Sequence, residues 1–168
     1  AIDAARCVRC GACERVCPVC VPAEKRPLPQ TVLAARVRDA AALEQSASGG
    51  IAWLLAEGWL RAGGAVYGAA FDEEMVLHHI RVTDAAELGR LQGSKYVQSD
   101  LREIYPLLRE DLNAGRDVLF FGTPCQAAGI RKTFGERENL MLCDLVCHGV
   151  PSPKLFADHI RCIEENGK

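Results

Sequence analysis

Four cysteines near the start of the chain constrain its fold and chemistry more than any other feature. Residues 7–18 read Cys-Val-Arg-Cys-Gly-Ala-Cys-Glu-Arg-Val-Cys-Pro, which is the C-x2-C-x2-C-x3-C-P pattern of bacterial ferredoxins. Thiolates at this spacing can surround one 4Fe–4S cluster as the backbone curls around it. Gly11 allows the chain to approach the inorganic sulfide closely, and Pro18 fixes φ just after the last cysteine. The run predicts four iron ligands: Cys7, Cys10, Cys13 and Cys17.

The remaining cysteines leave the number of clusters open. The chain holds nine cysteines, five of them in the first twenty residues. An odd, clustered set argues against a disulfide framework and favours metal or redox chemistry in a reducing compartment. A structural zinc site uses C-x2-C pairs set apart by a longer loop, so it fits this compact run poorly. In two-cluster ferredoxins the fourth cysteine binds the other cluster. Either a partner motif lies upstream of Ala1, or one cluster takes a remote ligand such as Cys20.

Length and composition exclude several other classes of protein. With 168 residues, 49% of them apolar and 25% charged, the chain is expected to form one globular domain with a small appended module. A net charge of −2 gives no reason to expect a nucleic-acid partner. The longest apolar stretch, residues 51–60, is too short to span a bilayer. Because no basic-then-apolar leader precedes the cysteines, we expect a cytoplasmic protein.

The chain divides at a proline-rich segment. Residues 21–29 hold three prolines and three charges and predict a linker. Residues 1–29 are therefore expected to form the 4Fe–4S module and its linker, and residues 30–168 an α/β domain with a mixed, partly parallel sheet. Apolar periodicity and capping residues predict helices at 32–44, from 51 to the Gly63-Gly64 pair, and at 84–91, 100–113, 124–134 and 153–166. Strands are predicted at 65–71, 76–82, 117–121 and 140–146.

Two of these strands are expected to pair as a hairpin and two to run in parallel. The short turn between 65–71 and 76–82 favours the hairpin, and the helix between 117–121 and 140–146 predicts a parallel βαβ unit. Two helices are expected to bury an apolar face in the core. Their inward residues would be Ile51, Leu54, Leu55, Gly58 and Trp59 in the first, and Leu155, Phe156, Ile160 and Ile163 in the second.

A cysteine-containing loop follows each strand of the predicted βαβ unit. Ligands bind outside the carboxyl ends of the strands in open α/β sheets, so we expect Cys125 and Cys147 to converge on one rim. Thr123 would cap a helix whose first turn holds Cys125, where free N–H groups favour a thiolate. These loops predict a second redox site with Cys125 and Cys147 as metal ligands or catalytic thiols. His148 would relay a proton there or simply donate a hydrogen bond. The residues expected to be structural are His78, His79, Cys143 and Cys162.

Five further motifs occur in order along the chain. They are Ser48-Gly49-Gly50, Val66-Tyr67-Gly68-Ala69, Gly93-Ser94-Lys95-Tyr96-Val97-Gln98-Ser99, Gly122-Thr123-Pro124-Cys125-Gln126 and Cys147-His148-Gly149-Val150-Pro151-Ser152-Pro153. Together with the ferredoxin run, this set resembles the coenzyme F420 hydrogenase/dehydrogenase beta-subunit family over nearly the whole chain after the linker.

The resemblance implies an iron–sulfur flavoprotein oxidoreductase. Such a protein carries FAD and 4Fe–4S clusters and transfers electrons between the clusters and a hydride-carrying substrate such as reduced coenzyme F420. Its partners would be coenzyme F420 or another small redox substrate, together with ferredoxin or the other subunits of a redox complex. The implied flavin contacts are Ser48, Gly49, Gly50, Ser94, Lys95, Tyr96 and Thr123. Lys95 would offset phosphate charge or negative charge on the reduced ring, and Tyr96 would stack or donate a hydrogen bond.

Length is the main departure from this family. Its members usually continue well beyond the Cys147 motif, so we expect residues 30–168 to be a domain truncated at its C-terminal end, and FAD binding by this piece alone stays open. Two alternatives remain. One is a non-catalytic electron-transfer or docking subunit of a larger redox complex, and the other is a zinc-stabilised interaction module.

Overall fold

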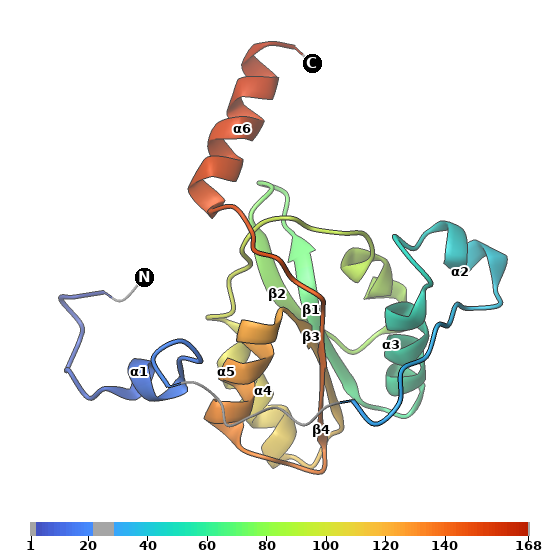
Figure 1. Ribbon diagram of the computed structural model, residues 1–168, viewed down its shortest axis with the longest axis horizontal. Helices are drawn as coiled ribbons and strands as arrows, with labels where there is room; N and C mark the ends of the chain where they lie inside the picture. The colour runs from blue at the N-terminus through green and yellow to red at the C-terminus, as the bar shows by residue number, and fades with distance from the viewer. Residues whose placement is uncertain (1–2, 22–28, 168) are drawn as a thin grey trace.

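A four-stranded mixed sheet with helices on both faces forms the body of the molecule (Figure 1). The computed structural model describes residues 3–21 and 29–167. The strands lie in the order β2-β1-β3-β4. β1 (Ala65–Phe71) pairs antiparallel with β2 (Leu77–Val82) and parallel with β3 (Val118–Gly122). β3 in turn pairs parallel with β4 (Leu140–Asp144). The predicted hairpin, the parallel βαβ unit and the mixed α/β class are confirmed.

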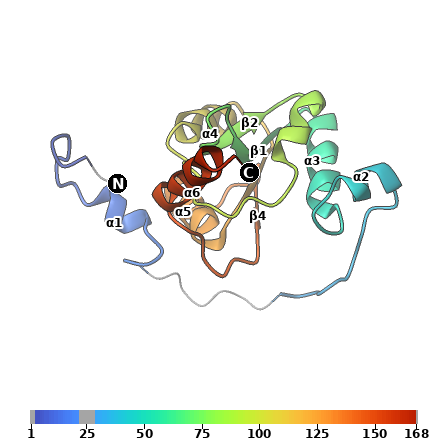
Figure 2. The ribbon, with the colours of Figure 1, turned by 90° about the horizontal axis from the view of Figure 1, so that it is seen from above.

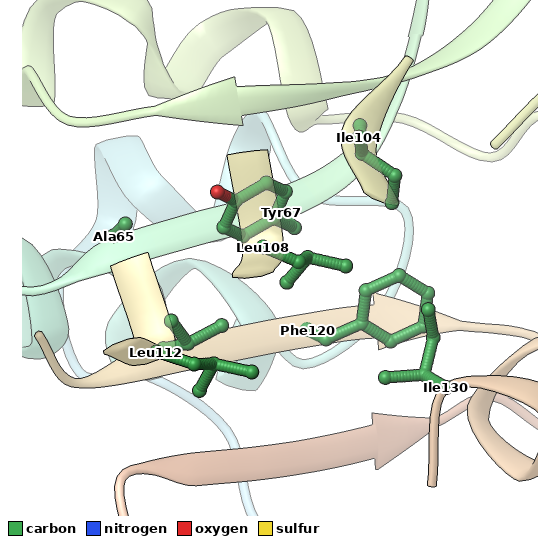
Figure 3. Packing of buried hydrophobic residues seen from close by; sticks show 8 residues of the cluster. Ala65, Tyr67, Ile104, Leu108, Leu112, Phe120 and Ile130 are labelled. Carbon is green, nitrogen blue, oxygen red and sulfur yellow. The ribbon is translucent and has the colours of Figure 1, made fainter. Parts of the chain in front are cut away.

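Alternate residues of the two central strands face two separate cores, because successive strand side chains point to opposite faces of a sheet. On one face, α4 (Ile104–Asn113) and α5 (Pro124–Phe134) pack over β1 and β3. Figure 3 shows this core, in which Tyr67 and Phe120 meet Leu108 and Ile130. On the other face, α3 (Ile51–Arg61) and the 3-10 helix η1 (Ala85–Leu91) cover Val66 and Leu119. Burial on both sides explains why both strands are continuous apolar runs.

The predicted buried face of α3 is wrong. Leu54 and Leu55 are exposed, and Ala56 is the buried residue of this helix. Trp53, Trp59 and Leu60 pack around Ala56 against the sheet. Only Trp59 was placed in the core correctly. A helix this apolar carries apolar residues on more than one face, so periodicity alone does not decide which face meets the sheet.

The helix expected at residues 32–44 is also largely wrong. Only α2 (Ala40–Glu44) forms, and it begins where the side chain of Asp39 accepts a hydrogen bond from the N–H of Ala42. The chain before it has no regular helix, because the N–H of Val37 donates to the carbonyl oxygen of Gly49 at 2.8 Å and the Val37 side chain is buried. A pairing between segments distant in sequence has replaced the local hydrogen bonds of a helix.

The last helix, α6 (Pro153–Glu165), does not pack into the core as expected. It projects from the body of the molecule (Figure 1) and has no buried residue. Leu155 is 62% exposed, and Ile163 is exposed as well. Near its start, Phe156 stacks on Phe71 with ring centroids 5.6 Å apart. Its periodicity predicted an apolar face, but periodicity cannot show what covers that face.

The N-terminal segment lies beside α5. Its short helix α1 (Ala12–Val16) is next to α5 in both views of the ribbon (Figures 1 and 2). The predicted linker falls mostly on residues 22–28, outside the described residues. None of the helices formed by the described ranges has both the length and the apolar content that a membrane span requires.

Candidate functional site

A cavity of about 850 Å³ lies at the carboxyl ends of β3 and β4. This is the place where ligands bind in open α/β sheets, and the volume is within the ordinary range of cofactor sites. Four segments far apart in sequence line it: the turn and helix start at 46–53, the loop at 91–99, the end of β3 at 121–123, and the loop at 145–150. Six of the seven predicted flavin contacts fall in the first two segments, and Thr123 falls in the third.

The start of α3 opens toward the cavity without a side-chain cap. Its N-cap, Gly50, has φ 73° and no side chain to accept a capping hydrogen bond from the first N–H groups, while Ile51, Ala52 and Trp53 of the first turn line the cavity. A Cβ atom on Gly50 would lie 2.7 Å from Cγ2 of Val37, so both the positive φ and the close packing require glycine. The first N–H groups of such a helix attract an anionic ligand.

The ammonium group of Lys95 is held by its own loop. Nζ donates to the carbonyl oxygens of Leu91 at 3.2 Å, Gln92 at 2.7 Å and Gly93 at 3.2 Å. Three donors on one ammonium group are thus used, and burial lowers the pKa of Lys95. Lys95 supplies positive charge to the cavity wall and shapes the loop, rather than offering a free proton to a ligand. Next to it, Tyr96 is 77% exposed at the cavity edge.

A chain of hydrogen bonds runs beneath the cavity. Nε2 of His79 bonds the carbonyl oxygen of Phe121 at 2.9 Å, so this nitrogen must carry the proton. Nδ1 therefore accepts, from the hydroxyl of Ser99 at 2.9 Å, and Nε2 of Gln126 donates to that hydroxyl oxygen at 2.8 Å. Burial lowers the pKa of His79, which keeps the ring neutral. The chain joins β2, the 91–99 loop and α5.

These buried polar residues show what the sequence analysis missed. His79 was expected to be structural, and it is buried and fully hydrogen-bonded, but it also lines the cavity. For Ser99 and Gln126, the sequence predicted no role beyond membership of a motif. Their one sequence signal was that each is the last residue of a motif, Ser99 of residues 93–99 and Gln126 of residues 122–126. His78, by contrast, forms an exposed pair with Asp72 at 2.8 Å.

Cys147 and His148 lie at the cavity, whereas Cys125 does not belong to its described lining. The Sγ atom of Cys147 accepts a weak hydrogen bond from the N–H of Gly149 at 3.4 Å. Cys125 is exposed in the first turn of α5, where its Sγ atom lies 3.2 Å from Oγ1 of Thr123. As predicted, Thr123 is the N-cap of that helix, and its N–H donates to Oε1 of Gln126 at 2.9 Å. The two thiols follow neighbouring strands, but only one of them meets the cavity.

The two cysteines expected to be structural differ. Cys143 is half-buried and packs against the core around α3. Burial raises the pKa of its thiol, as expected for an inert side chain. Cys162, also expected to be structural, is exposed on α6, because α6 does not pack into the core.

The N-terminal cysteines lie on a tightly curled segment at the surface. Arg9 and Gly11 have positive φ values of 55° and 70°, and the N–H of Arg9 points at Sγ of Cys7 at 3.4 Å. Backbone N–H groups of Cys20 and Val19 lower the pKa of Cys17, which favours the thiolate. All four ligand candidates carry free thiols. Within the described ranges, no three Cys, His, Asp or Glu side chains are already gathered as a metal-binding group.

This donor set suits an iron–sulfur cluster. Thiolate is the ligand such clusters use. Positive φ values and an N–H directed at sulfur are the features that let a short loop wrap around a cluster and donate to its sulfur atoms. Cys20 contacts Cys17 through a side-chain hydrogen bond that raises the pKa of Cys20. Cys20 therefore lies within reach of the run, as a remote ligand would have to.

Comparison with known proteins supports the N-terminal site and the fold. Residues 1–19 match the family model described as a 4Fe-4S binding domain. A solved structure, from the F420-reducing [NiFe] hydrogenase complex of Methanosarcina barkeri studied by xenon derivatization, aligns with a TM-score of 0.59 and 20% sequence identity. The alignment covers 75% of this chain and 47% of that one, so the chain spans about half the length of this neighbour. No curated protein matches the chain.

These findings support a 4Fe–4S cluster at the N-terminal cysteines and an iron–sulfur electron-transfer role. The structural neighbour shows that the α/β domain has a fold found in that hydrogenase complex.

Proposed function

We propose that this chain is an iron–sulfur flavoprotein oxidoreductase. Residues 1–29 would carry a 4Fe–4S cluster on Cys7, Cys10, Cys13 and Cys17, and residues 30–168 would bind FAD in the cavity. The observation that carries this proposal is the convergence of the Ser48, Lys95, Thr123 and Cys147 segments on one cavity. They lie far apart in sequence, and nothing in local structure requires them to meet.

The residues around the cavity fit a flavin nucleotide. The uncapped N–H groups at the start of α3 suit a phosphate group. Nε2 of Gln92 is buried at the lining without a hydrogen-bond partner in the described part of the chain. A Cβ atom at Gly93 or Gly149 would have no described atom within 4 Å, so a ligand can approach the backbone there. FAD, when bound, would supply the exchange between a hydride and single electrons.

The protein's own side chains would bind and orient the ligands. Tyr96, exposed at the edge, would stack on a planar ring, and the Lys95 ammonium would favour negative charge in the cavity. Cys147 and His148 would meet the substrate, with His148 exchanging a proton. We propose that the substrate is coenzyme F420 or another small hydride carrier. The electron partner would be ferredoxin or another subunit of a redox complex, because the structural neighbour belongs to an F420-reducing hydrogenase complex.

The direct test measures iron, sulfide, zinc and flavin per chain in an anaerobic preparation supplied with FAD. We expect iron, sulfide and flavin. Gln92→Leu should weaken FAD binding about tenfold, because FAD would lose its hydrogen bond with the buried amide of Gln92. Gln45→Leu, the same change at the C-cap of α2, is the matched control. Iron without flavin would favour the non-catalytic electron-transfer subunit, and zinc without iron would refute the cluster.

Cys125 is proposed as a thiol of a second redox site with Cys147. Cys125→Ser should change the visible spectrum or the electron-transfer rate of the loaded protein. An unchanged spectrum and rate would return Cys125 to a structural role.

A further inference from the structure

The N-terminal module rests on the outer face of α5. Nζ of Lys132 donates a hydrogen bond to the carbonyl oxygen of Val21. The carbonyl oxygen of Val16 lies 4.0 Å from the position that a Cβ atom on Gly129 would occupy. Figures 1 and 2 show α1 beside α5 from two directions. Two residues of α5 therefore contact the module. Gly129 lies near Val16, just before Cys17, and Lys132 binds Val21, just after Cys20.

This face of α5 is free of the core. The helix buries Gln126, Ala127 and Ile130 against the sheet. Gly129 and Lys132 stand three residues apart, on adjacent turns of another face. A Cβ atom at Gly129 would make ordinary contacts with the carbonyl oxygen of Val16 at 4.0 Å and with Tyr105 Oη at 3.9 Å, so the position has room for a methyl group. A long side chain at residue 129 would meet both neighbours.

The charge of Lys132 has a consequence for a cluster held by the module. Lys132 donates to the carbonyl oxygen of Val21, whose own N–H donates to the carbonyl oxygen of Cys17 at 2.9 Å, so the ammonium group lies one hydrogen-bonded turn from a cluster ligand. Four thiolates around a 4Fe–4S core leave a net negative charge, which grows when the cluster accepts an electron. A nearby cation stabilises the more negative, reduced form. The neighbouring Arg131 forms a separate ion pair with Glu136 at 3.4 Å.

We propose that the face of α5 formed by Gly129 and Lys132 is the docking surface of the N-terminal iron–sulfur module, and that Lys132 raises the reduction potential of its cluster. Lys132 holds the backbone after Cys20 and places its charge beside the cluster ligands. The α/β domain thereby sets both the position and the potential of a cluster whose ligands all come from residues 1–29. This inference rests on the cluster of the proposed function and does not require FAD.

The docking is tested first on the full chain without a cluster, by hydrogen exchange. We expect Lys132→Met and Gly129→Leu each to increase exchange at least threefold at the amides of residues 12–21. Amides of β1 and β3 should be unchanged, which shows that the core is folded. Arg131→Met removes the same charge from the adjacent residue and should have no effect on residues 12–21. Equal exchange in wild type and both docking variants would overturn the docking surface.

The potential is tested on the protein with its cluster, by an anaerobic redox titration monitored by electron paramagnetic resonance. Lys132→Met should shift the midpoint to a more negative potential at unchanged iron content, whereas Lys132→Arg and Arg131→Met should stay near wild type. Equal shifts in Lys132→Met and Arg131→Met, or no shift in either, would overturn the role of Lys132. A wild-type chain that binds no iron refutes both the proposed cluster and this role, while the exchange experiment still decides the docking surface.

Discussion

Replacing Asp111 by alanine should cost the α/β domain about 3 kcal/mol of stability, because breaking a buried ion pair by removing one partner costs roughly 3–5 kcal/mol. Asp111 lies on α4 and is 2% exposed. Its carboxylate accepts from Tyr67 Oη at 2.6 Å and from Nε and Nη2 of Arg81 at 2.8 and 2.5 Å. The substitution leaves a tyrosine hydroxyl and two guanidinium groups without their acceptor, since Arg116 also pairs with Asp111 at 3.4 Å.

The lower end of that range applies because the Arg81 side chain is 27% exposed and regains some contact with water. The Tyr67 hydroxyl gains no such contact with water, since Tyr67 is fully buried. Burial, followed by the bond to Asp111, raises the pKa of Tyr67, so its hydroxyl stays protonated and needs an acceptor. A loss of about 3 kcal/mol lowers the melting temperature of a domain of this size by roughly 6–12 °C.

The assay is urea denaturation followed by circular dichroism, with the slope compared between variants. Asp158→Ala removes a carboxylate from the exposed pair with Lys154, where the two atoms are 3.0 Å apart. It should cost under about 0.5 kcal/mol. Tyr67→Phe should fall between, at about 1.5 kcal/mol, for one hydrogen bond to a charged group. An Asp111→Ala variant no less stable than Asp158→Ala would refute the reasoning.

Three further predictions concern the site. Burial lowers the pKa of His79, so as pH falls the unfolded chain binds a proton at this residue before the folded chain does. His79 therefore makes the stability of the wild type decline below about pH 6.5. The difference in unfolding free energy between wild type and His79→Gln should shrink from pH 8 to pH 5, and a constant difference would contradict this. Gly50→Ala should cost about 1 kcal/mol more than Gly115→Ala in the same urea assay, because both positions have positive φ but a Cβ atom at Gly50 would lie 2.7 Å from Val37, whereas one at Gly115 would have no described atom within 4 Å. Cys10→Ser should lower iron content and the cluster signal while circular dichroism shows an unchanged α/β core; full cluster occupancy would reject Cys10 as a ligand.

Local signals in the sequence determined much of the secondary structure. Thr123 before Pro124 marks the start of α5, which ends at Phe134 as predicted. The strand, helix and strand around it form the parallel unit. Capping residues, glycine stops and apolar runs act over a few residues, so they can be interpreted without knowledge of the fold. The cysteine run is equally local, since its ligands lie within eleven residues.

Contacts between distant segments decided the rest. The Val37–Gly49 hydrogen bond prevented the helix expected before α2. Periodicity reveals that a helix has an apolar face, but which element covers it depends on the packing of the whole chain. For the same physical reason, the cavity and the surface of α5 beneath the N-terminal module exist only in the tertiary structure.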